Sequence, residues 1–270
     1  MILKLKRFFK YSKAEKTDII LRRVTSLIFS FTSAFKLKNR LAFSYLPDSI
    51  AHDNAYPDVK TLYDKFRKKN KSNNGGDIHR LTSLILNIEK ILFEDKVEGD
   101  FAELGVWRGN SSAVLAFYAK KTNRHCFLLD TFEGFSEKDL KGYDSQFDKG
   151  HFSNTSIEIV KDVIGSELID VCSFLIGYFP ESITEELKSR RFSIVSLDAD
   201  LYEPTKAGLE WFFPRMNDGG IFLLHDYSSR GWDGCKRAID EFCHRENQKV
   251  VLIPDKSGSA FVIINKPKDS

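Results

Sequence analysis

The stretch Phe101-Ala-Glu-Leu-Gly-Val-Trp-Arg-Gly-Asn-Ser-Ser112 decides how this chain folds. Its apolar start ends in an acid and Gly105, and Gly109 follows four residues later. The next residues, Asn-Ser-Ser, are of the kind that begin helices. This order predicts a strand, a tight turn and a helix N-terminus, which together hold a nucleotide-like cofactor at the carboxyl edge of a parallel sheet.

The spacing of the two glycines limits the kind of cofactor. A dinucleotide fingerprint needs Gly-x-Gly-x-x-Gly, and a phosphate-binding loop ends in Gly-Lys-Ser/Thr. Neither pattern is present at this turn. Glu103 would place a carboxylate in the turn, where it would repel a pyrophosphate and suit a cationic ligand. We therefore expect a nucleotide-like cofactor that is not a dinucleotide.

Charge is distributed unevenly along the 270 residues. Residues 1–40 carry 11 Lys/Arg and two Asp/Glu, whereas the other 230 residues carry 30 Lys/Arg and 36 Asp/Glu. One interpretation of this basic end is a peripheral membrane contact, because each basic residue near an anionic surface contributes about 1 kcal/mol. The alternative is an extra helix that packs on the core or on a second copy of the chain in a homo-oligomer, or a frayed tail.

The cysteines and the hydropathy pattern favour a cytoplasmic protein. The four cysteines form no Cys-x-x-Cys pair and lack the spacing of Cys/His metal sites, which indicates a reducing compartment. No apolar run approaches the roughly 18 residues that a membrane span needs. The polar, glycine-ended stretch at residues 65–76 is typical of a linker. We expect a basic, helical extension and linker over residues 1–76 and one domain over residues 77–270.

From residue 77 onward, apolar strands alternate with helices. This pattern predicts an α/β fold with a doubly wound, mostly parallel sheet that is buried on both faces. Ligands of such sheets bind outside the carboxyl ends of the strands. The expected strands are residues 101–106, 126–129, 171–176, 194–197, 221–224, 250–253 and 260–264. The expected helices are residues 78–93, 111–121, 156–164, 182–188, 205–213 and 235–245.

Four of the expected strand ends carry acids: Glu103, Asp130, Asp198 and Asp226. One such acid alone more often caps a turn or a helix, but four at one edge of a sheet would converge on a single crevice. Asp130 lies at the distance from the glycine turn where a ribose diol is usually bound. Asp198 and Asp226 offer the hard oxygen ligands that Mg²⁺ prefers. His225 could be a ligand, a base or a structural histidine beside the acid.

Taken in order, six segments of the chain resemble class I S-adenosylmethionine-dependent O-methyltransferases, in particular the macrocin O-methyltransferase (TylF-like) group. This resemblance implies a seven-stranded sheet whose last strand is antiparallel, and S-adenosylmethionine as the cofactor. The segments, over about residues 98–245, are Glu103-Leu-Gly-Val-Trp-Arg-Gly-Asn-Ser, Asp130-Thr-Phe-Glu-Gly-Phe, Gly177-Tyr-Phe-Pro-Glu-Ser, Leu197-Asp-Ala-Asp-Leu-Tyr-Glu-Pro-Thr, Gly219-Gly-Ile-Phe-Leu-Leu-His-Asp-Tyr and Gly234-Cys-Lys-Arg-Ala-Ile-Asp-Glu-Phe.

The resemblance also implies roles for single residues. Asp198 and Asp226 match the family's Mg²⁺-binding acids, and Asp198 or His225 would accept the proton. His225 stands where the macrolide-sugar members tend to have another Asp. Residues 142–155, which include His151, match a mobile lid over the acceptor. The implied cofactor-binding residues are Glu103, Gly105, Gly109, Asn110, Ser111, Asp130, Thr131, Gly177 and Tyr178.

The resulting hypothesis is methyl transfer from S-adenosylmethionine to a hydroxyl of a small molecule, sugar or glycan. A nucleotide-sugar oxidoreductase is disfavoured by the missing dinucleotide fingerprint and by Glu103. A nucleic-acid methyltransferase is disfavoured because Asp198-Ala-Asp-Leu-Tyr lacks the Asn/Asp-Pro-Pro-Tyr/Phe pattern and because the chain beyond the basic end is acidic. A non-catalytic member of the same fold is the remaining alternative.

Overall fold

The computed structural model describes residues 78–229, 231–255 and 257–266, together with Lys16, Thr17, Ile20, Val24 and Leu62. Contacts within the chain divide it into two units, residues 1–44 and 45–270. The expected linker at residues 65–76 and, apart from four isolated positions, the expected membrane contact of residues 1–40 lie outside the described residues. No described helix is long and apolar enough to cross a membrane.

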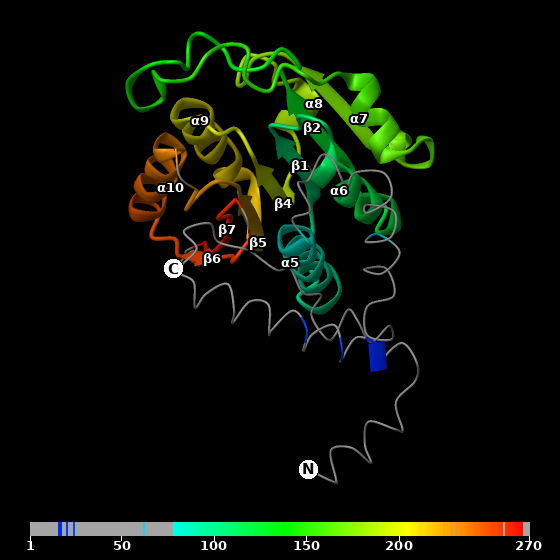
Figure 1. Cartoon of the computed structure of the whole chain (residues 1–270). Helices are drawn as coiled ribbons and strands as arrows, with labels where there is room; N and C mark the ends of the chain where they lie inside the picture. The colour runs from blue at the N-terminus through cyan, green and yellow to red at the C-terminus, as the bar shows by residue number, and fades with distance from the viewer. Residues whose placement is uncertain are drawn as a thin grey trace. The chain divides into compact units, whose positions relative to one another are not determined.

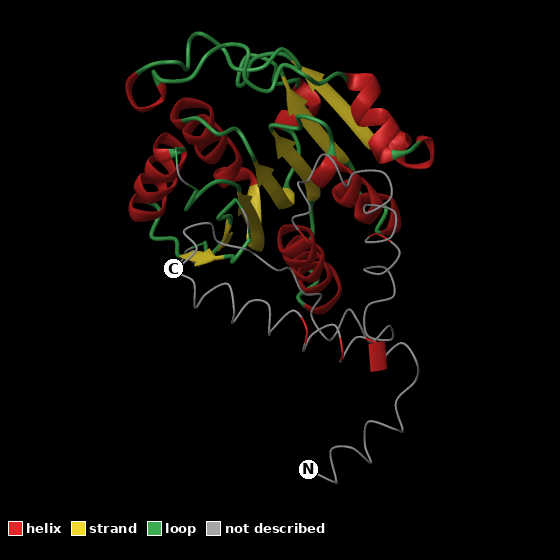
Figure 2. Cartoon of the chain, in the orientation of Figure 1, coloured by secondary structure: helices red, strands yellow, loops and turns green. Residues whose placement is uncertain are grey.

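Seven strands form one sheet in the order β3-β2-β1-β4-β5-β7-β6 (Figures 1 and 2). Strands β1 to β5 pair in parallel, whereas β7 is antiparallel to both β5 and β6. This confirms the doubly wound, mostly parallel sheet with an antiparallel last strand. The strands are β1 Asp100–Leu104, β2 Cys126–Asp130, β3 Cys172–Ile176, β4 Phe192–Leu197, β5 Met216–Leu224, β6 Val250–Leu252 and β7 Ala260–Ile263.

Helices cover both faces of the sheet (Figure 2). The longer helices are α5 Ile78–Glu89, α6 Asn110–Lys121, α7 Ile157–Ile164, α9 Tyr202–Phe212 and α10 Asp233–Arg245. The shorter ones are the π-helix η1 Lys90–Glu94, the 3₁₀ helices η2 Gly142–Asp144, η3 Ser166–Val171 and η4 Phe213–Arg215, and the four-residue α8 Glu185–Lys188.

The strands divide the apolar core into two layers because successive side chains of a strand point to opposite faces. In β2, Cys126 and Leu128 pack with α5, α6 and α7, whereas Phe127 and Leu129 pack with α9 and α10. Leu62, from the segment expected to be an extension, is buried in the first layer. All four cysteines are free, as expected from the reducing compartment that their spacing indicates.

Some element ends differ from the expectation, and the backbone explains each case. Strand β1 ends at Leu104, because Gly105 has a φ of 86° and leaves the extended conformation. Helix α8 begins only at Glu185, where the Thr184 side chain accepts a hydrogen bond from the Leu187 N–H and caps it. Helix α9 starts at Tyr202, so Pro204 lies in its first turn, where no amide hydrogen is needed.

Candidate active site

The glycine turn lies where the strand order reverses, between the carboxyl ends of β1 and β4. A Cβ atom on Gly105 would lie 2.1 Å from the carbonyl oxygen of Asp198, so no side chain fits there. Gly109 has a φ of 81°, and a Cβ atom on it would lie 2.9 Å from Val160 of α7. The two glycines therefore let β1 approach β4 closely and bring α6 onto α7, which leaves a crevice at the switch point.

Asp130, at the end of β2, holds this turn in place. Its Oδ2 accepts hydrogen bonds from the backbone N–H groups of Val106 at 2.7 Å and Trp107 at 2.8 Å. Its Oδ1 accepts from the N–H of Phe132 at 2.7 Å. Asp130 and the following Thr131 both line the cavity, as expected for cofactor-binding residues. Asp130 thus shapes the turn and also lines the cavity.

Glu103 lies below the turn and not in the cavity. Its side chain is fully buried and accepts a hydrogen bond from the Ser112 hydroxyl of α6. Burial raises the pKa of Glu103 to about 7, although the Ser111 and Ser112 hydroxyls favour the charged form. Glu103 is therefore not among the residues that line the cavity, and its hydrogen bond supports the start of α6. Gly109 also contributes no surface to the cavity.

The cavity itself has a volume of about 450 Å³, within the range of roughly 300–1,000 Å³ typical of small-molecule sites. Asn110 Oδ1 is buried and has no hydrogen-bond partner among the described residues. Tyr178 donates a hydrogen bond to Asp139 at 2.7 Å, and burial and this carboxylate raise the tyrosine's pKa. The expected cofactor-binding residues that line the cavity are Gly105, Asn110, Ser111, Asp130, Thr131, Gly177 and Tyr178.

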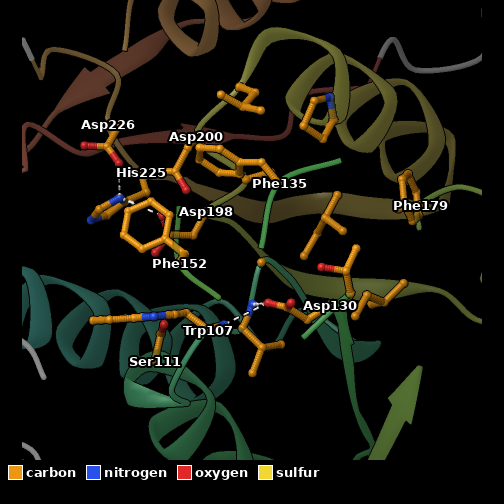
Figure 3. Close-up of a pocket in the computed structure, with 18 of the residues that line it drawn as sticks. Trp107, Ser111, Asp130, Phe135, Phe152, Phe179, Asp198, Asp200, His225 and Asp226 are labelled. Carbon is orange, nitrogen blue, oxygen red and sulfur yellow. Dashed lines mark hydrogen bonds and ion pairs between the residues drawn. The ribbon is translucent and has the colours of Figure 1, made fainter. Parts of the chain in front are cut away.

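A cluster of acids and one imidazole forms the opposite side of the cavity (Figure 3). The Nδ1 atom of His225 lies 2.7 Å from Asp198 Oδ1 and 2.5 Å from Asp226 Oδ2. Asp200 completes the cluster, which we call the acid cluster: Asp198, Asp200, His225 and Asp226 each offer one ligand atom, and these atoms lie within 4.8 Å of one another. Asp200 and Asp226 adopt left-handed backbone conformations, with φ values of 58° and 57°.

The charges of the acid cluster depend on one another. Burial alone would raise the pKa of Asp198, but His225 and Arg80 outweigh it and hold this pKa well below its usual range. Burial and Arg80 oppose a proton on His225, yet Asp198 and Asp226 raise the pKa of His225 to about 10. Burial and the neighbouring carboxylates raise the pKa of Asp200. At neutral pH these shifts favour an imidazolium paired with carboxylates.

Aromatic side chains form a wall beside the acid cluster. Phe135, Phe152 and Trp232 line the cavity, and Phe147 stacks on Trp232 with ring centroids 4.4 Å apart. His151, from the segment matched to a lid, stacks on Phe135 at the rim and remains exposed. We refer to Phe135, Phe147, Phe152 and Trp232 as the aromatic wall.

The segment that carries much of this wall is fixed at both ends. The buried Asp144 accepts a hydrogen bond from the N–H of Tyr202, the first residue of α9, at 2.7 Å. Asn154 accepts one from the indole N–H of Trp107 at 3.0 Å. The wall is therefore held to α9 and to the glycine turn in the structure.

Besides the aromatic wall, Asp200 and Arg80 were not predicted as site residues. Asp200 stands two residues after Asp198 at the end of β4, but it was not assigned a role. Arg80, from the first turn of α5, binds Asp198 Oδ2 through Nη2 at 2.7 Å. Arg80 is 118 residues from Asp198 in the sequence, and no sequence signal links the two residues.

The strand order, the antiparallel β7 and the glycine turn at the switch point define the class I methyltransferase fold. The solved structure of the O-methyltransferase NovP has this fold; it superposes with a TM-score of 0.61 at 21% identity, over 77% of this chain and 95% of that one. Calicheamicin methyltransferase CalS11 superposes with a TM-score of 0.55 at 19% identity, over 84% of this chain and all of that one.

A model of the macrocin O-methyltransferase (TylF) family matches residues 75–257, and the chain belongs to this family. A similar protein is the 8-demethyl-8-(2,3-dimethoxy-α-L-rhamnosyl)-tetracenomycin-C 4′-O-methyltransferase of Streptomyces olivaceus, 32% identical over 61% of this chain and 65% of that protein. The mycinamicin III 3″-O-methyltransferase of Micromonospora griseorubida is 27% identical, over 66% of this chain and 74% of that protein. The chain thus spans less than two thirds of the first relative.

Proposed function

We propose that this protein is an S-adenosylmethionine-dependent O-methyltransferase that methylates a hydroxyl of a sugar or glycan. The observation that carries the proposal is one cavity that joins the glycine turn to the acid cluster. Such an arrangement can bind a cofactor on one side and orient an acceptor hydroxyl on the other. Holding both reactants in line contributes roughly 7–11 kcal/mol to lowering a displacement barrier.

The cofactor side of the cavity offers groups that fit S-adenosylmethionine. The unpartnered, buried Asn110 Oδ1 is an acceptor suited to an ammonium group, and it lines the same cavity as Gly105. Asp130 would accept hydrogen bonds from the ribose, and Gly177 and Tyr178 would lie near the adenine. When bound, the cofactor supplies an electrophilic methyl group on a positively charged sulfonium.

His225 is placed to take the proton of the acceptor hydroxyl. Its Nδ1 is held between Asp198 and Asp226, while its Nε2 is buried and has no partner among the described residues. Because the unloaded cluster keeps His225 protonated, this proton must leave before Nε2 acts as a base. A nearby cation would lower the pKa of His225 and release that proton. A general base of this kind contributes about 10²–10⁴-fold to the rate.

The acid cluster also fits a divalent cation such as Mg²⁺. Three carboxylates supply hard oxygen ligands, and the ligand atoms lie close enough together for one ion. Asp198 and Asp226 would hold the ion, with Asp200 as a further ligand. Such an ion would lower the pKa of the acceptor hydroxyl and fix its direction.

The aromatic wall supports a sugar as the acceptor. Phe152 and Trp232 present ring faces and edges beside the acid cluster, where the apolar face of a sugar ring can pack. The tetracenomycin relative is named for 4′-O-methylation of a compound that carries a rhamnosyl group, and the mycinamicin relative for 3″-O-methylation of mycinamicin III. We extend this acceptor class to the present chain. A cytoplasmic location, a membrane contact through residues 1–40 and a homo-oligomer remain proposals from the sequence.

The proposal is tested by incubating the full chain with S-adenosylmethionine and a panel of rhamnosides, other glycosides and sugar nucleotides. Mass spectrometry would detect an acceptor that has gained one methyl group. Calorimetry with S-adenosylhomocysteine measures cofactor binding separately, with NAD as the competitor that a dinucleotide enzyme would prefer. Binding of NAD without binding of S-adenosylhomocysteine would overturn the proposal. Cofactor binding without transfer to any acceptor would favour the non-catalytic alternative.

A further inference from the structure

Arg80 connects α5 to the acid cluster. Its Nη2 lies 2.7 Å from Asp198 Oδ2, and the two side chains are only 20% and 21% exposed. The other oxygen of Asp198, Oδ1, lies 2.7 Å from Nδ1 of His225. Both carboxylate oxygens of the residue at the centre of the cluster are therefore in contact with cationic side chains.

A divalent ion bound to Asp198 would compete with Arg80. A metal ligand must turn an oxygen lone pair toward the ion, whereas Asp198 Oδ2 now accepts a hydrogen bond from the guanidinium. Two cations within a few ångströms of one carboxylate also repel each other strongly in a partly buried site. Arg80 is always charged, so it cannot relieve this repulsion by losing a proton.

We propose that Arg80 is the resident counter-ion of the acid cluster and that it competes with a divalent cation for Asp198. The proposal rests on the metal site of the proposed function. In the unloaded protein, Arg80 compensates the charge of Asp198 and holds the first turn of α5 against the sheet edge. Loading of an ion moves the guanidinium away from Oδ2, so occupancy of the metal site is coupled to the position of α5.

The experiment measures Mn²⁺ affinity by calorimetry in the wild type, Arg80→Gln and Arg80→Lys, without acceptor. We expect Arg80→Gln to bind Mn²⁺ at least tenfold more tightly, because the competing charge is gone. Arg80→Lys keeps the charge and should stay close to the wild type. The matched control is Arg190→Gln, which removes an ion pair with Asp100 at 3.2 Å, at the opposite end of β1. Its Mn²⁺ affinity should not change.

Equal or weaker Mn²⁺ binding in Arg80→Gln would overturn the proposal, as would the absence of Mn²⁺ binding in both proteins. A second measurement needs no variant. Hydrogen exchange of the wild type should become faster in the first turns of α5 when Mn²⁺ is added, because Arg80 loses its ion pair with Asp198. Unchanged or slower exchange there would also overturn the proposal. Methyl transfer is not a readout of either experiment, so failure of the proposed function remains distinguishable.

Discussion

The buried Glu103 and the partly buried Asp198, two carboxylates at neighbouring strands, differ in charge because their partners differ. Glu103 belongs to β1, and Asp198 follows β4, the strand that pairs with β1. Glu103 is in contact with hydroxyl groups of α6, and burial raises its pKa to about 7. Asp198 is in contact with Arg80 and His225, and its pKa lies well below the usual range.

This difference in pKa separates a structural role, which suits Glu103, from a chemical role, which suits Asp198. A carboxyl group that gains a proton near neutral pH is a poor partner for a cation, but it can pack and hydrogen-bond beneath a helix N-terminus. A carboxylate that stays charged can orient an imidazole or hold a metal ion. The burial of an acid is therefore not enough to assign its role, because the charged groups around it decide which form it keeps.

The largest effect is expected from Asp198→Asn, which removes the charge that orients His225. Turnover should fall by about 10³-fold, within the range of a lost acid–base group. The affinity for S-adenosylhomocysteine should stay within about threefold, because the cofactor side of the cavity is untouched. Calorimetry and a methyl-transfer assay measure the two quantities. Asp218→Asn is the control, since Asp218 lies in β5 away from its carboxyl end and caps only the backbone of Lys266. Undiminished turnover in Asp198→Asn would contradict its assignment.

Removal of divalent cations tests whether the charge on Asp198 serves a metal ion. EDTA should lower the rate by about 10²-fold, and added Mg²⁺ should restore it, because an ion on the cluster contributes several kcal/mol to stabilising an acceptor oxyanion. The affinity for S-adenosylhomocysteine measured in EDTA reports whether the cofactor side stays intact. A rate that neither falls in EDTA nor rises with Mg²⁺ would contradict a metal ion at the acid cluster. Orientation of His225 would then be the role left to its carboxylates.

The pH dependence of stability tests the imidazolium between Asp198 and Asp226. In EDTA, the folded pKa of His225 is about 10, above its ordinary value of about 6.5. The folded protein then binds more protons than the unfolded chain between these values, so its free energy of unfolding falls as pH rises through this window. Relative to His225→Gln, the wild type should lose about 2 kcal/mol between pH 7 and 8.5. Urea unfolding at each pH measures this difference, and a constant difference would contradict the ion pair.

The sequence was sufficient for the fold and for the residues that end strands. Periodic apolar runs located the sheet, and Gly105, Asp130, Asp198 and Asp226 followed from the rule that parallel strands end at one edge. The glycine turn was predicted because its geometry needs residues without side chains. These features are local, and local features are what a single sequence encodes most directly.

Contacts between distant segments were harder to predict. Arg80 meets Asp198 only because α5 packs beside the switch point, and no local pattern carries that packing. The aromatic wall was missed for a similar reason, since Phe135 and Trp232 are far apart in sequence and their rings meet only in the fold. Glu103 was expected to lie in the turn and suit a cationic ligand; it belongs to β1 instead, and its side chain contacts Ser112 of α6.

The smallest expected effect comes from Glu103→Gln, which tests the structural role assigned to Glu103. The folded pKa of about 7 exceeds the ordinary value of about 4.3, so the folded state binds the extra proton and stability falls as pH rises between these values. Glutamine stays neutral and avoids this loss. The free energy of unfolding of the variant, relative to the wild type, should increase by about 1.5 kcal/mol between pH 5 and 6.5. If the difference in free energy of unfolding between the variant and the wild type stays constant or decreases with pH, Glu103 keeps its charge as Asp198 does. The contrast between the two carboxylates would then be wrong.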